Sequence, residues 1–214
     1  TGLQYKQELA WIKSSRAVEY HVLYDSVRGI ANLASNSTNI EGTNTTMLTS
    51  LNANGFSLGT DAPQHVNVNG RTYVAWSFKA GGAPTTDNVA GAGATPTAGS
   101  VKIDGSDLGT ALAGTTAATR LSANTKAGFS VVKFVGTGAN ATVGHGLGAA
   151  PEIIIFKSST AISGWKMFTN QTSSPSTQVM ELSDPSGVQT PTNPFNSTLP
   201  SSTVISLGSY SDVN

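Results

Sequence analysis

Two stretches of the chain that lie far apart in the sequence share nearly the same pattern of residues. Residues 2–18 align without gaps with residues 146–162, at an offset of 144 residues. The apolar character still matches at Leu23 and Tyr24, which align with Met167 and Phe168. The identical positions, by their numbers in the first stretch, are Gly2, Leu3, Glu8, Lys13, Ser14, Ser15 and Ala17. Because self-similarity of this kind marks a repeated structural unit, we expect two copies of one module.

A second match places an insertion in the second copy. Residues 57–60 (SLGT) match residues 206–209 (SLGS) at an offset of 149 residues, five more than the first offset. Insertions are tolerated best in surface loops. We therefore assign the extra residues to an enlarged loop within the proline-rich stretch 184–200.

Short β-rich runs separated by turn residues predict an all-β fold of antiparallel strands. In residues 71–78, Val74, Trp76 and Phe78 alternate with smaller side chains, the period of two expected when one face of a strand is buried. Asn69-Gly70 before this run is a strong hairpin signal, because a type I′ turn needs positive φ at both positions. Residues 110–121 offer only a weak helical pattern. The expected strands are residues 9–13, 22–27, 46–51, 71–78, 129–135, 153–157 and 204–207.

The composition divides the chain into three parts. Residues 80–127 are rich in Ala, Gly and Thr and hold few large apolar side chains, so they predict a low-complexity linker with one short strand at Val101-Lys102-Ile103. Two interpretations remain open for this part: a spacer between modules, or a segment that covers the sheet edge of a neighbouring module or subunit. The flanking modules are assigned to residues 1–79 and 128–214.

The two copies do not show the same strands. The strand expected at residues 128–135 has no counterpart before the first copy, and the strand expected at residues 71–78 has none after the second. We therefore expect module 1 to lack its first strand and module 2 its last strand. Apolar strand edges should then be exposed near residues 9–12 or 204–207.

Composition also excludes several classes of function. Charged residues make up 11% of the 214 residues, with 12 basic and 12 acidic, so no field attracts nucleic acid. The chain has no cysteine, which excludes disulfides, thiolate zinc sites and cysteine nucleophiles. Its longest apolar runs are far shorter than the roughly 20 residues that span a bilayer. Neither a nucleic-acid partner nor membrane insertion is expected.

Five runs of the sequence together carry a family resemblance: residues 9–15 (LAWIKSS), 21–29 (HVLYDSVRG), 54–59 (NGFSLG), 73–82 (YVAWSFKAGG) and 145–151 (HGLGAAP). As a set they resemble repeated modules of large tail-fibre-like structural proteins in the virions of marine tailed bacteriophages, especially cyanophages. The resemblance implies tandem jelly-roll or lectin-like β-sandwiches on a virion appendage. It implies homo-oligomers that contact other virion proteins, and no catalysis.

The alternative function is binding of a host surface glycan, by an adhesin module at an appendage tip or on a bacterial surface. Trp11 aligns with Ile155, and Trp76 alternates as a core residue would, so both tryptophans are expected to be buried. The aromatic residues that we expect to be exposed for stacking on a sugar are Trp165, Tyr20, Tyr24 and Tyr210.

Enzymatic and metal chemistry find little support in the sequence. A polysaccharide depolymerase usually needs two carboxylates across a groove, whereas Glu8 and Glu152 recur beside a strand start, which predicts that they accept backbone N–H groups. The three histidines, His21, His65 and His145, lack metal-ligand spacing, and Asp104-Gly105 predicts a turn rather than a calcium loop. No catalytic residue, cofactor or metal is expected.

Overall fold

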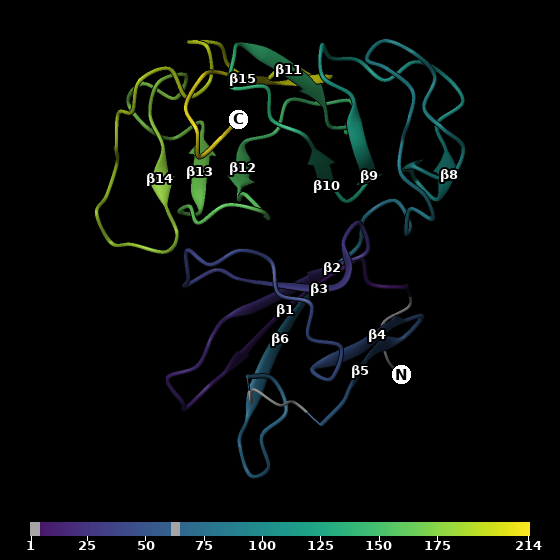
Figure 1. Cartoon of the computed structure of the whole chain (residues 1–214), viewed down its shortest axis with the longest axis vertical. Coiled ribbons are helices and arrows are strands. Elements are labelled where there is room, and N and C mark those ends of the chain that lie inside the picture. Colours follow the sequence, from purple (N-terminus) through teal and green to yellow (C-terminus); the bar gives the residue numbers. More distant parts are fainter. Residues whose placement is uncertain (1–4, 61–64) are drawn as a thin grey trace.

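The chain folds into β-strands joined by turns and loops (Figure 1). The structure is a computed structural model that describes residues 5–60 and 65–214, so Gly2, Leu3 and Asp61 lie outside the described residues. The described part contains no α-helix, and therefore none that could cross a membrane. Most strand pairs are antiparallel. The expected all-β fold of β-sandwich type is confirmed.

The N-terminal half, in the lower part of Figure 1, contains a four-stranded sheet in the order β3-β2-β1-β6 and a β4-β5 hairpin. The strands are β1 (Leu9–Ser14), β2 (Val22–Asp25), β3 (Gly29–Ala34), β4 (Leu48–Asn52), β5 (Gly55–Leu58) and β6 (Tyr73–Phe78). In β1, Ala10, Ile12 and Ser14 are buried. Their side chains point to one face because alternate residues of a strand face opposite sides. Ala10 and Ile12 pack with Met47 and Leu48 in one core.

The C-terminal half contains a β10-β9-β7-β8 sheet, a β12-β13-β14 sheet and the β11-β15 pair. The strands are β7 (Val101–Ile103), β8 (Ser106–Asp107), β9 (Ala118–Asn124), β10 (Phe129–Phe134), β11 (Ala141–Gly144), β12 (Ile153–Phe156), β13 (Lys166–Thr169), β14 (Met180–Glu181) and β15 (Val204–Leu207). Their buried side chains form a second core that includes Leu121, Phe156, Phe168 and Leu207. Against the antiparallel expectation, β7 pairs with β9 in parallel.

The duplicated stretches have the same strand pairing. In the first copy Leu9 pairs with Asp25, and in the second copy Ile153 pairs with Thr169, at the same offset of 144 residues. The third strand of each sheet also occupies the same place, since β3 pairs with β2 and β14 with β13. In contrast, residues 57–58 lie in β5, which pairs with β4, whereas residues 206–207 lie in β15, which pairs with β11.

Residues 80–127 contain three strands, so the prediction of a single short strand is wrong. β9 lies between β10 and β7 in its sheet, and Val101, Ala118, Leu121 and Ala123 belong to the C-terminal core. Small side chains can build this core because they pack beneath the larger aromatic residues of the other strands. This segment therefore forms part of the C-terminal fold and does not act as a spacer.

A single asparagine organises the loop that precedes β7. The Asn88 side-chain oxygen accepts hydrogen bonds from the backbone N–H groups of Ala90 and Thr97, both at 3.0 Å. Its amide nitrogen donates to the carbonyl of Ala118, at 3.0 Å. These bonds supply order that apolar burial alone would not give to such a polar segment.

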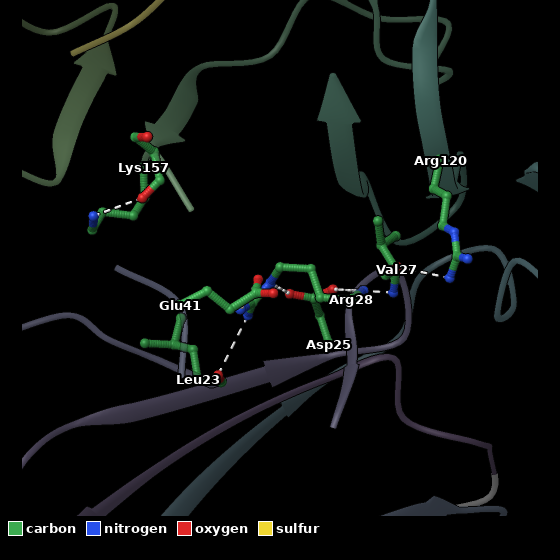
Figure 2. Close-up of polar contacts among 8 residues, drawn as sticks. Leu23, Asp25, Val27, Arg28, Glu41, Arg120 and Lys157 are labelled. Atoms are coloured by element: carbon green, nitrogen blue, oxygen red, sulfur yellow. Dashed lines mark hydrogen bonds and ion pairs between the residues drawn. The ribbon is translucent and has the colours of Figure 1, made fainter. Parts of the chain in front are cut away.

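Polar contacts join the two halves (Figure 2). Asp25 accepts hydrogen bonds from the backbone N–H groups of Val27 and Arg28 and forms an ion pair with the Arg28 guanidinium, at 2.6 Å. Arg28 also reaches Glu41, whose backbone N–H donates to the carbonyl of Ser159 in the C-terminal half. The loop after β2 is held against the other half directly, because the Arg120 guanidinium of β9 donates to the Val27 carbonyl (Figure 2).

Candidate functional site

An aromatic groove lies on the outer face of the β3-β2-β1-β6 sheet. Trp11 of β1 pairs directly with Trp76 of β6, and their ring centroids are 5.8 Å apart. The groove has a volume of about 310 Å³ and is lined by Trp11, Lys13, His21, Trp76 and Phe78. The opposite face of the same sheet packs on the N-terminal core. The groove is thus fixed to a rigid sheet, which favours a preformed binding surface.

The large aromatic side chains on this face of the sheet are unusually exposed to solvent. Trp76 is 48% exposed and Phe78 is 38% exposed. Phe78 also stacks on Phe129 of β10, with ring centroids 5.0 Å apart, so the aromatic row continues onto the C-terminal half. Contiguous exposed apolar surface of this kind marks an interaction site more often than scattered single residues do.

The prediction that Trp76 is buried is wrong. The alternation in β6 indicates one apolar face, but it does not say on which side of the sheet the core lies. Trp76 and Phe78 share the face that carries Trp11, whereas Ala10 and Ile12 face the core. Trp11 itself is half-buried, and its indole N–H is enclosed without an acceptor among the described residues.

The polar side of the groove is formed by the cationic side chain of Lys13 and the neutral imidazole ring of His21. Burial lowers the pKa of His21, and the nearby charge of Lys13 lowers it further. His21 is therefore neutral at pH 7, with a donor and an acceptor on its imidazole. Lys13 donates a hydrogen bond to the carbonyl of Ser14. An exposed aromatic ring with a few polar groups beside it can stack on a sugar ring and form hydrogen bonds with its hydroxyl groups.

A second hollow, of about 220 Å³, is lined by amide and hydroxyl side chains together with apolar ones such as Val22, Ile40 and Met47. Tyr20 stands at this hollow and contacts His65 edge to face, with ring centroids 4.8 Å apart. Glu19 forms an ion pair with Arg71, and its other carboxylate oxygen lies 3.2 Å from Nδ1 of His65, so these contacts hold this end of the hollow. The side-chain oxygen of Asn32, also in the lining, is buried without a hydrogen-bond partner among the described residues.

The four aromatic residues predicted to contact a glycan are not brought together. Tyr20 is exposed at the second hollow, as expected, but Tyr24 is fully buried in the N-terminal core. Trp165 is also buried, and its indole N–H donates to the carbonyl oxygens of Ala34 and Ser37. Tyr210 is half-buried and its hydroxyl donates to Asp212, at 3.1 Å. The exposure expected for Tyr24 and Trp165 is therefore wrong.

The acidic residues singled out in the sequence have structural contacts. Glu8 is buried and accepts a hydrogen bond of 2.8 Å from the Ala80 backbone N–H, which confirms the predicted role for this residue. Burial raises the pKa of Glu8, while this hydrogen bond opposes the rise. Asp104 lies in a turn and accepts hydrogen bonds from the backbone N–H and the hydroxyl of Thr125. Glu152, the counterpart of Glu8, is exposed.

Residues 5–60 and 65–214 hold no group of three metal-ligating side chains. His145 is buried within the C-terminal half, where Nδ1 accepts a hydrogen bond from the Leu147 N–H and Nε2 lies 3.2 Å from the Ser201 carbonyl. His145 is thus occupied by bonds within the fold.

No curated protein and no solved structure matches this chain. One family model does match it, over residues 1–214, and it is described as a domain of unknown function. The chain therefore belongs to the DUF7483 family.

Proposed function

We propose that the chain is a structural module of a bacteriophage virion appendage, a tail or head fibre, without catalytic activity. Its resemblance to repeated modules of virion structural proteins supports this proposal. In the appendage it would contact further copies of itself and other virion proteins. Its role would be mechanical, since a long appendage needs connecting units that keep their shape under load.

The bonded junction between the two halves carries this proposal. Trp165 donates hydrogen bonds into the 34–37 loop, and Gly81 donates to the Ser122 hydroxyl at 2.9 Å. Arg120, on β9, reaches the carbonyl of Val27 in the loop after β2. Two sheets with the same strand pairing are thus joined by short contacts that involve several segments. A joint of this kind resists bending better than a flexible linker does.

The test is the location of the protein in infected cultures. Peptides of this chain are expected in purified particles of the phage that encodes it, and gold-labelled antibodies against the chain are expected on fibres. Antibodies against the major capsid protein provide the matched control. Detection of the chain in infected cells, together with its absence from particles purified to constant density, would contradict the proposal.

A second candidate function is binding of a host surface glycan, and the aromatic groove favours it. Trp76 and Phe78 offer exposed aromatic surface, and Lys13 and His21 supply polar groups beside it. Stacking of an aromatic ring on the apolar face of a sugar follows the same physics as other aromatic contacts.

Affinity electrophoresis in gels that contain host polysaccharide tests this second candidate. We expect retardation of the native chain and loss of retardation in Trp76→Ala. Val89→Ala is the control, because Val89 is exposed but lies outside the groove. Equal mobility of all three proteins at every polysaccharide concentration would contradict glycan binding at the groove.

A further inference from the structure

β12 has an unpaired edge in the described part of the chain. It stands at the end of the β12-β13-β14 sheet, and its other side pairs with β13. The Glu152 carbonyl accepts a hydrogen bond from Asn170 in the segment that follows β13. Because backbone groups alternate in direction along an antiparallel strand, those of Ile153 and Ile155 point to the unpaired edge.

The side chains on this edge are apolar and exposed. Ile153 is 61% exposed and Ile155 is 46% exposed. Their neighbours Ile154 and Phe156 pack on the C-terminal core, so the strand itself is firmly held. An exposed apolar edge strand is a template for pairing with another strand, and native proteins usually cover or charge such an edge.

The first copy of the duplication shows what covers the equivalent edge. β1 occupies the place of β12, and β6 pairs with it antiparallel along its full length. In this ladder Leu9 pairs with Phe78 and Trp11 with Trp76. Ile153 and Ile155 are the counterparts of Leu9 and Trp11, because β1-β2 and β12-β13 pair in the same register.

The surroundings of Glu152 independently indicate that a strand like β6 belongs at the edge of β12. Its counterpart Glu8 is buried and accepts a hydrogen bond from the N–H of Ala80, two residues beyond the end of β6. Burial raises the pKa of Glu8, and the hydrogen bond from Ala80 and the charge of Lys79 are among the effects that oppose the rise. The Glu152 side chain is exposed and has no such partner in the described residues. A strand that ends in Lys-Ala would complement it in both charge and hydrogen bonding.

We propose that the β12 edge is a strand-acceptor site, and that its occupant is a strand with the sequence pattern of β6 from another module of this family. The added strand pairs antiparallel with β12, with its Phe opposite Ile153 and its Trp opposite Ile155. Its terminal Lys-Ala reaches Glu152. In Figure 1 the strand would lie on the side of β12 that faces β10, which is itself the edge strand of its sheet. Backbone hydrogen bonds provide the affinity and the apolar side chains provide the register.

A synthetic peptide with the sequence of residues 71–80 (RTYVAWSFKA) tests the site on the full chain. In the β1-β6 ladder the Ser15 N–H donates to the Thr72 carbonyl, so the alternation directs the backbone groups of Trp76 and Phe78 toward the partner strand. A peptide N-methylated at these two positions loses both donors. The matched control is N-methylated at the positions of Ala75 and Ser77, whose donors point away.

We expect saturable binding of the unmodified and control peptides by fluorescence anisotropy, and about 30-fold weaker binding when both inward donors are methylated, because two hydrogen bonds are lost. Hydrogen exchange should slow at Ile153 and Ile155. Glu152→Gln should weaken binding several-fold by removing charge, while Glu41→Gln should not. Equal affinity of the two methylated peptides, absence of binding, or protection confined to residues 73–78 would each overturn the proposal. None of these readouts depends on whether the protein resides in a virion.

Discussion

The indole nitrogen of Trp165, in the C-terminal half, donates a hydrogen bond of 2.8 Å to the carbonyl oxygen of Ala34, in the N-terminal half. It also donates to the Ser37 carbonyl, at 3.0 Å. One buried side chain therefore ties two segments that are separated by more than half of the sequence. The same residue had the features of a sugar-binding tryptophan in the sequence, but the fold uses it as an anchor.

Trp165→Phe keeps the aromatic ring and removes the donor. We expect the free energy of unfolding to fall by about 1–3 kcal/mol, because the carbonyls of Ala34 and Ser37 lose their partner. The measurement is chemical denaturation followed by circular dichroism. Trp76→Phe is the control and should change stability by less than about 0.5 kcal/mol, because Trp76 is exposed. An unchanged midpoint for Trp165→Phe would show that the junction does not depend on this hydrogen bond.

Gly81 occupies a position at the junction that has no room for a side chain. A Cβ atom at Gly81 would lie 2.5 Å from the Lys102 carbonyl oxygen and closer still to the Ala123 carbonyl oxygen. We expect Gly81→Ala to destabilise the protein by about 1–3 kcal/mol, since backbone atoms must move. Gly91→Ala is the matched control, because nothing lies within 4 Å of that position. Equal thermal midpoints for the two variants would contradict this account.

The sequence predicted the strands better than it predicted which faces are buried. Gly, Asn and Pro at turns and the period of two are local signals. The duplicated stretches predicted two copies of one module, and in the structure they share the same pairing, of β1 with β2 and of β12 with β13. The buried face depends on which sheet packs against which, and this is not local. For that reason Trp76 was assigned to the core, although Ala10 and Ile12 face it instead.

The open strand edge illustrates the same limit. It was expected near residues 9–12 or 204–207, but β1 is paired on both sides. β15 pairs with β11 on one side only, yet its side chains are largely buried and form no exposed apolar edge. In the sheet of the second copy, the exposed apolar edge is instead β12. Comparison of the two copies could have located it, since the strand that follows the first copy pairs with β1, the counterpart of β12. The prediction of a linker at residues 80–127 is wrong for another reason. Composition does not show that small side chains pack beneath larger ones from distant strands.

The Lys166–Glu181 ion pair replaces an apolar pair of the other copy. The two charged atoms are 2.5 Å apart and the side chains are nearly buried, whereas Val22 and Ala34 occupy the equivalent paired positions. We expect Glu181→Ala alone to cost about 3 kcal/mol, because Lys166 keeps a poorly solvated charge. The double variant Lys166→Val with Glu181→Ala should recover most of this loss. Denaturant titration of the three proteins tests it, and a double variant less stable than Glu181→Ala would contradict the expectation.

His145 makes stability depend on pH in a defined direction. Burial lowers the pKa of His145 from its usual 6.5, although its contact with the Ser201 carbonyl opposes the shift. The neutral ring satisfies both contacts, because Nε2–H donates to Ser201 and Nδ1 accepts from Leu147. Below pH 6.5 the unfolded chain binds a proton at this residue more readily than the folded chain does. The stabilisation is therefore complete above pH 6.5 and is lost progressively as the pH falls toward the folded-state pKa.

The measurement is an NMR titration of the His145 ring proton together with the free energy of unfolding at pH 7.5, 6.5 and 5.5. We expect the ring to titrate below 6.5 and stability to decrease across this series. His145→Gln should be less stable at pH 7.5, because the geometry of the two contacts changes, and should show a shallower decrease toward pH 5.5. His21 contributes in the same direction, since burial also lowers its pKa, so His21→Gln should remove only its own share of the slope and leave the share of His145. A His145 resonance that titrates at or above 6.5 would show that the buried ring carries its proton in the folded state, with the opposite dependence of stability on pH.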